Sequence, residues 1–351
     1  MDTGLKVLGT LGLAAVLATV WRAKREVAAT TLKDAWWWLM AASLLWTGAW
    51  FISSIWDGSD RAIADRIWYA IAVVMLCPPV AVLGARRPIV RVWTWFVLLP
   101  LLLVLGLPLA VGWGSGPPYP PLELELPATL GCVLVLVMGA GNYFGTRFTL
   151  ASLLFATSLL LLVVPLSAVV PDVGLSPERA RMWATVAIGS AAMSARHQSS
   201  RDGSMRNPLD RLWLDFRDSF GIVWAKRLQD RINQTARDER WPVRLEMHEL
   251  VESQSGETPL PSREGLGDFG ELSRVEGQSL QSTHPISNFT REPVGSSKAT
   301  SRQSAQVEHT FRWLLRRFVE SEWIDARLQR AASLPGETGG EPKGSTPATH
   351  S

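Results

Sequence analysis

The first 195 residues contain a series of apolar runs, each close to the length that a helix needs to cross a bilayer. The hydrocarbon core is about 30 Å thick, so a helix that rises about 1.5 Å per residue needs roughly 20 apolar residues. Seven runs meet or approach this length: 5–21, 35–56, 67–84, 92–113, 127–145, 148–170 and 181–196. We therefore expect residues 1–195 to form an all-α polytopic membrane domain with about seven transmembrane helices.

Tryptophans mark the ends of several runs. An indole ring prefers the headgroup level of a bilayer to both bulk water and the hydrocarbon centre. Trp21 closes the first run, and the second run opens with Trp36, Trp37 and Trp38. Core aromatic residues of a soluble helical protein would not gather at the ends of apolar runs, so this pattern favours membrane embedding.

Positive charges gather in every second connection between the runs. The connections after the first, third and fifth runs carry Arg22, Lys24, Arg25, Lys33, Arg86, Arg87, Arg91 and Arg147. The alternate connections carry fewer, chiefly Arg61, Arg66, Arg179 and Arg181. Because the Lys/Arg-rich side is cytoplasmic, this pattern predicts an external N-terminus and a cytoplasmic tail. The predicted side of the tail depends on the short seventh run, because with only six spans the tail would be external.

Targeting signals in the sequence indicate which membrane the protein occupies. The basic sequence WRAKRE follows the first run, whereas a cleaved signal peptide has its positive charge before the apolar stretch. We therefore expect a retained anchor. No eukaryotic targeting or lipidation motif is present in the sequence, which favours a bacterial inner (cytoplasmic) membrane.

Few polar side chains fall within the expected spans. None of the five histidines lies at membrane depth, and neither does any lysine. Proton relays, haem ligation and retinal attachment need such groups, so we expect no cofactor, no metal and no enzymatic activity. Asn142 and Tyr143, in GAGNYFG, could form a polar site between helices, or they could belong to a helix-packing face that ends at the interface.

The stretch LDRLWLDFRDSFGIVWAKRLQDRINQ, residues 209–234, has the spacing of an amphipathic helix. Its apolar stripe includes Leu212, Trp213, Phe216, Phe220 and Trp224. Acidic residues lie between these positions, so the helix cannot span a bilayer. Its stripe can bind either the membrane surface or a protein surface, and the near balance of Asp and Arg favours protein.

The remaining tail divides by composition. Residues 241–251 predict an extended segment, and 306–332 predict helices with Phe311, Leu315 and Phe318 on one stripe. This second stripe could supply part of the surface for the first, or RWLLRRFV could lie on anionic lipid. Residues 252–305 and 333–351 are poor in apolar residues and are expected to be disordered. We thus expect a small, mainly helical tail module in 196–332.

These observations predict a multi-pass scaffold, or a signalling or assembly component, whose tail binds a cytoplasmic or membrane protein partner. The lipid bilayer is the other expected partner, and homo-oligomerisation stays open. Nucleic acid is not expected, because Lys and Arg in the tail are matched by Asp and Glu. The alternative is a transporter or channel for a neutral or weakly polar solute, built on proline-broken spans and a path beside Asn142.

Overall fold

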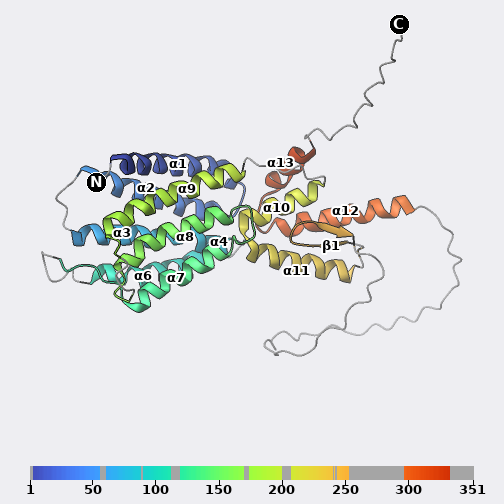
Figure 1. Ribbon diagram of the computed structural model, residues 1–351. Coiled ribbons are helices and arrows are strands. Elements are labelled where there is room, and N and C mark those ends of the chain that lie inside the picture. The colour runs from blue at the N-terminus through green and yellow to red at the C-terminus, as the bar shows by residue number, and fades with distance from the viewer. Residues whose placement is uncertain are drawn as a thin grey trace, which may run out of the picture.

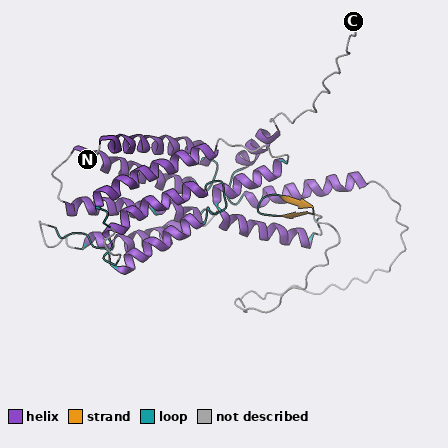
Figure 2. Cartoon of the chain, in the orientation of Figure 1, coloured by secondary structure: helices purple, strands orange, loops and turns teal. Residues whose placement is uncertain are grey.

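The structure is a computed structural model that describes residues 3–55, 61–87, 90–111, 119–169, 174–199, 207–239, 241, 243–252 and 296–332. These residues are mainly helical, as expected (Figure 2). Most of the expected linker, residues 253–295, and the expected C-terminal tail, residues 333–351, lie outside the described residues.

The first part of the chain forms a bundle of helices that lie side by side (Figure 1). We call residues 3–199 the helical bundle. It comprises α1 (Thr3–Val27), α2 (Lys33–Ile55), α3 (Arg61–Met75), α4 (Cys77–Leu83), α5 (Val90–Trp93), the π-helix η1 (Thr94–Leu98), α6 (Leu99–Ala110), α7 (Leu126–Gly141), α8 (Thr149–Val163), the short η3 (Val164–Leu166) and α9 (Pro177–Ser199).

Three helical stretches are long and apolar enough to cross a membrane. They are Val7–Val27, Arg61–Leu83 and Thr149–Leu166. Thr94–Ala110 and Leu126–Gly141 are apolar but shorter. Many large apolar side chains on the outside of the bundle are exposed, among them Trp95, Phe96 and Leu103. A contiguous apolar exterior of this kind is typical of a surface that contacts lipid or protein.

Prolines shape the apolar helices because each one lacks a backbone donor and collides with the preceding turn. Pro78 and Pro79 lie in the first turn of α4, directly after the break that ends α3. Pro100 follows a π-helical turn in which the Leu99 N–H bonds to the carbonyl of Thr94. Pro108 remains inside α6. The prolines therefore bend or divide the helices without ending the bundle.

The last bundle helix, α9, packs closely against α1. An added Cβ on Gly189 would lie only 2.5 Å from the Cα of Gly12, so the two backbones cross in near contact. The indole N–H of Trp46 in α2 also donates to Thr185 Oγ1 at 3.1 Å. The seventh apolar run, expected to cover only 181–196, is therefore part of a 23-residue helix that is built into the bundle.

The chain after residue 206 forms a second unit, which we call the C-terminal module. It comprises α10 (Pro208–Phe220), α11 (Ile222–Asp238), the antiparallel strands β1 (Val243–Leu245) and β2 (Leu250–Glu252), α12 (Ser296–Leu315) and α13 (Ser321–Ala332). Asn207 caps α10, as its Oδ1 accepts the Leu209 N–H at 3.0 Å. Helix α12 begins ten residues before the start expected at 306.

The amphipathic stretch 209–234 is not one helix, as we predicted, but two. Gly221 separates α10 from α11 with φ +80° and ψ 174°, a conformation that is nearly restricted to glycine. The change of direction lets Phe220 and Trp224, from different helices, both contact Phe318, with ring centroids 5.5 and 5.1 Å away. Phe216 packs on the same ring at 5.3 Å.

Candidate functional site at the junction of bundle and C-terminal module

The C-terminal module is attached to one end of the helical bundle (Figure 1). Three connections of the bundle contact it: residues 28–32 between α1 and α2, residues 84–87 after α4, and residues 142–148 between α7 and α8. We call this contact the junction. Together with the helix ends beside them, these connections carry Arg22, Lys24, Arg25, Lys33, Arg86, Arg87 and Arg147.

Asn142, the first of the two expected polar residues, lies at the centre of the junction. Its Nδ2 donates to the carbonyl oxygen of Phe220 at 3.1 Å, and its Oδ1 accepts the Val223 N–H at 3.0 Å. Its own carbonyl accepts the Ile222 N–H at 2.7 Å. Asn142 is 2% exposed. The side chain therefore holds the turn between α10 and α11 with both of its polar atoms.

Tyr143 makes a second contact of the same kind, since its hydroxyl donates to the Ser219 carbonyl at 3.4 Å. The Trp224 indole N–H of α11 also donates to the carbonyl of Val82, in the last turn of α4, at 3.0 Å. Asn142 and Tyr143, for which the sequence left open either a polar site between helices or a helix-packing face, lie directly after α7 and contact the module.

Backbone bonds join the connection 28–32 to the segment between α12 and α13. Thr31 N–H donates to the Phe318 carbonyl at 2.8 Å, and Glu320 N–H donates to the Ala29 carbonyl at 2.9 Å. The Thr31 hydroxyl bonds in turn to the Ala85 carbonyl, at 2.8 Å. Two backbone–backbone bonds and one threonine hydroxyl therefore join parts of the chain that are far apart in the sequence.

Ion pairs surround these bonds. Arg147 approaches Asp215 at 3.3 Å and Asp218 at 3.2 Å, and Arg327 approaches Asp215 at 3.1 Å. Asp218 also accepts from Arg217 at 2.9 Å, and its side chain is only 5% exposed. Burial lowers the pKa of the Arg327 guanidinium, and the Asp215 carboxylate opposes that shift. Charge at the junction is therefore paired within the chain.

The residues predicted as partner-binding stripes lie inside the module. All eight are buried: Leu212, Trp213, Phe216, Phe220, Trp224, Phe311, Leu315 and Phe318. The stripe of α10 and the start of α11 packs on the stripe of α12, with the Trp213 and Phe311 rings 6.2 Å apart. Each stripe therefore covers the other, which is the internal pairing that the sequence left open. A partner of the folded module would contact other residues.

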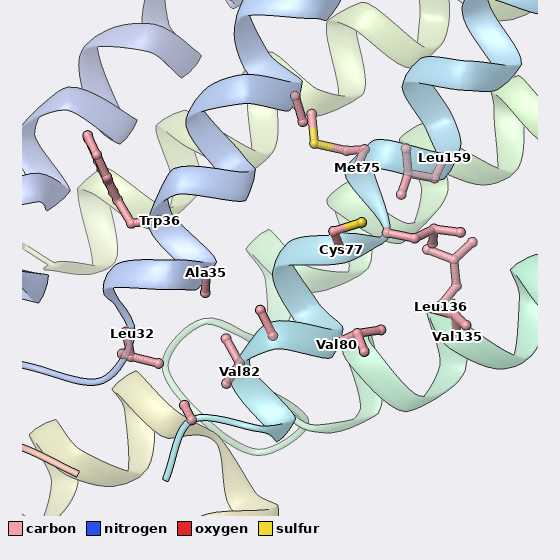
Figure 3. Close-up of a cluster of buried hydrophobic side chains, with 14 of the residues drawn as sticks. Leu32, Ala35, Trp36, Met75, Cys77, Val80, Val82, Val135, Leu136 and Leu159 are labelled. Atoms are coloured by element: carbon pink, nitrogen blue, oxygen red, sulfur yellow. The ribbon is translucent and has the colours of Figure 1, made fainter. Parts of the chain in front are cut away.

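A cavity of about 370 Å³ adjoins the junction on the bundle side. We call it the junction cavity. Its walls come from α1, α2, α4, α7 and α8, and α10 and α13 contribute lining residues on the side of the module. Leu32, directly before α2, and Val82 of α4 both line it and are labelled in Figure 3.

Sequence reasoning missed a buried charged pair at the opposite end of the bundle. Asp65 of α3, 4% exposed, pairs with Arg181 of α9. We had counted Arg181 as a charge of a connection, whereas it lies inside α9. Arg66 is also buried and donates to the carbonyls of Ala62 and Pro120, at 3.1 and 2.9 Å. The sequence contains one signal for this pair. Asp65 and Arg181 have opposite charges, and each lies at or just before the start of an expected span.

Within the described residues no group of three or more His, Cys, Asp or Glu side chains is arranged to hold a metal ion. Comparisons of the chain with protein-family models, with curated proteins and with solved structures find no match.

Proposed function

We propose that this chain is a seven-span inner-membrane protein with a cytoplasmic C-terminal module, and that it acts as a membrane scaffold or as a signalling or assembly component. The observation that carries the proposal is the junction. The connections with most Lys and Arg gather at one end of the bundle, where the module also attaches. The positive-inside rule assigns that end to the cytoplasm.

A rigid attachment favours signalling or assembly over simple tethering. Three connections of the bundle, which end or begin α1, α2, α4, α7 and α8, are hydrogen-bonded to the module. A shift of any of these helices therefore changes the position of the module. Conversely, a protein bound to the module restricts the bundle, because coupling between two sites is reciprocal.

The partner surface must lie outside the buried stripes. Trp313 is 52% exposed on α12, with the Arg317 guanidinium 5.1 Å from its ring, and Arg316 is exposed beside it. Tryptophan and arginine contribute a large share of the binding energy in protein interfaces. We assign the protein partner to this face of α12.

Topology can be tested with single cysteines, because the native Cys77 and Cys132 are buried and give little background. We expect a membrane-impermeant maleimide to label Glu125→Cys in intact cells, but to label Arg231→Cys only after permeabilisation. Equal labelling of both positions in intact cells would contradict the odd number of spans. Extraction of the protein by carbonate would contradict membrane embedding altogether.

The partner is tested by crosslinking the full chain in membranes and comparing Trp313→Ala with Arg231→Ala, an exposed residue on α11. We expect a stoichiometric protein to be lost with the first variant and kept with the second. Solute uptake by purified protein in liposomes would instead support the transport alternative. That alternative needs a path away from Asn142, whose amide is bonded on both sides to the module.

A further inference from the structure

The junction cavity combines two environments in one space. Most of its wall is apolar and comes from bundle helices, including Trp36, Pro79, Ala151 and Phe155. Its volume, about 370 Å³, lies in the range of roughly 300–1,000 Å³ that is typical of small-molecule sites. Small residues such as Ala35, Ala140 and Ala151 leave this space between helices that elsewhere pack closely.

Charged groups gather at the end of the cavity where the module closes it. Asp218 and Arg327 contribute from α10 and α13, and Glu26 contributes from the last turn of α1. The Arg327 side chain is 12% exposed and stacks 4.0 Å above the Trp323 ring, which also lines the cavity. Glu26 is exposed and marks the rim.

The groups that line the junction cavity favour an amphiphilic ligand. A fully polar ligand would place its charges against the apolar wall, and a hydrocarbon alone would make no polar contact with the Glu26 carboxylate or the Arg327 guanidinium. A ligand with an apolar chain and a polar head matches both the apolar wall and the charged end of the cavity. The cavity also lies at the end of helices long enough to cross a membrane, where lipid headgroups are at the same level.

The two charges at the polar end select the headgroup. Glu26 and Arg327 line the cavity with opposite charges, whereas the Asp215 and Asp218 carboxylates are paired with arginines of the chain. A zwitterionic head matches both lining groups, with its phosphate toward the Arg327 guanidinium and its ammonium toward the Glu26 carboxylate.

We infer that the junction cavity binds one zwitterionic phospholipid, with an acyl chain among the bundle helices and its headgroup between Glu26 and Arg327. The inference rests on the proposed membrane embedding. A lipid in this position contacts the bundle and the module at once. The phospholipid therefore completes the junction, and its headgroup is a ligand of the module as well as of the bundle.

The test uses the full chain, purified in mild detergent after its membrane embedding has been established by carbonate resistance. The protein is stripped of lipid and returned to nanodiscs of phosphatidylethanolamine and phosphatidylglycerol, and retained lipid is identified by native mass spectrometry. We expect one phosphatidylethanolamine to be retained per chain. Three variants test the parts of the inference. Ala151→Phe fills the cavity, and Glu26→Gln removes the charge at its rim. Leu107→Phe is the control, because it places the same ring on the exposed outside of α6.

Ala151→Phe should lose the lipid while Leu107→Phe keeps it. Glu26→Gln should weaken the preference for phosphatidylethanolamine over phosphatidylglycerol by about tenfold, the effect of one charge-assisted bond. If Ala151→Phe fails to fold, Ala140→Leu fills the cavity from α7 instead. A carbonate-resistant wild type that retains no phospholipid, or filled variants that retain it, would overturn the inference and leave membrane embedding intact. Extraction by carbonate would overturn both.

Discussion

The Asn142 side chain donates a hydrogen bond to the backbone carbonyl of Phe220, across the boundary between the helical bundle and the C-terminal module. This bond and its partner, from the Val223 N–H, satisfy two buried backbone groups at the turn between α10 and α11. One side chain at the end of α7 thus supports the fold of another part of the chain.

Replacement of Asn142 by leucine should loosen the junction. It leaves the Phe220 carbonyl and the Val223 N–H without their partner, at a cost of roughly 1–3 kcal/mol for each buried group. Asn142→Asp keeps the acceptor for Val223 but places a carboxylate against the Phe220 carbonyl, so it should also destabilise. Limited proteolysis of membranes measures the release of the module. Unchanged cleavage in Asn142→Leu would show that the other bonds of the junction hold the module without the Asn142 side chain.

Gly221→Ala should be the most damaging single methyl addition in the module. Its backbone, at φ +80°, disfavours an L side chain, and an added Cβ would lie 2.1 Å from Asn142 Nδ2. Gly145→Ala is the matched control, because Gly145 has φ +78° but open space around it. The control should lose about 1–2 kcal/mol from the backbone alone, and Gly221→Ala should lose clearly more. Thermal unfolding in detergent gives the comparison, and equal losses would mean that the contact with Asn142 relaxes freely.

Gly189→Ala should separate α1 from α9. The new Cβ would lie 2.5 Å from the Gly12 Cα, which is backbone and cannot turn aside. Gly48→Ala, in α2, adds the same methyl group to open space, and it should stabilise the helix by up to about 1 kcal/mol. The expected result is melting temperatures that shift in opposite directions. A neutral Gly189→Ala would mean that the two helices are free to slide.

Asp218→Asn should destabilise the junction far more than Asp230→Asn. The Asp218 carboxylate is 5% exposed and pairs with Arg147 and Arg217, and loss of one member of a buried pair costs about 3–5 kcal/mol. Asp230 pairs with Lys226 at 62% and 60% exposure, where a pair contributes about 0.5 kcal/mol or less. Denaturant unfolding followed by tryptophan fluorescence distinguishes them. Similar losses would place Asp218 in contact with solvent.

Much of the secondary structure follows from the sequence because it depends on local patterns. The apolar runs predict the bundle helices, and the stripes predict α10 and α12. These features depend on periodicity, which a few neighbouring residues determine.

The junction could not be predicted in the same way, because its bonds join residues that are distant in the sequence. Asn142 looks like an intramembrane polar residue until the turn at Gly221 is placed against it. The glycine itself was hidden by a stripe that continues through it at helical spacing. Likewise, Asp65 and Arg181 look like solvated charges as long as the helices that contain them are not side by side.

The pairing of the two stripes has a consequence for the order of synthesis. The aromatic side chains of α10 leave the ribosome well before Phe311 and Phe318, which cover them in the finished protein. Until the last helices emerge, Phe216 and Phe220 form an open apolar surface of the kind that chaperones and proteases recognise. A chain that stops before α12 lacks the residues that cover this surface, so the surface stays exposed.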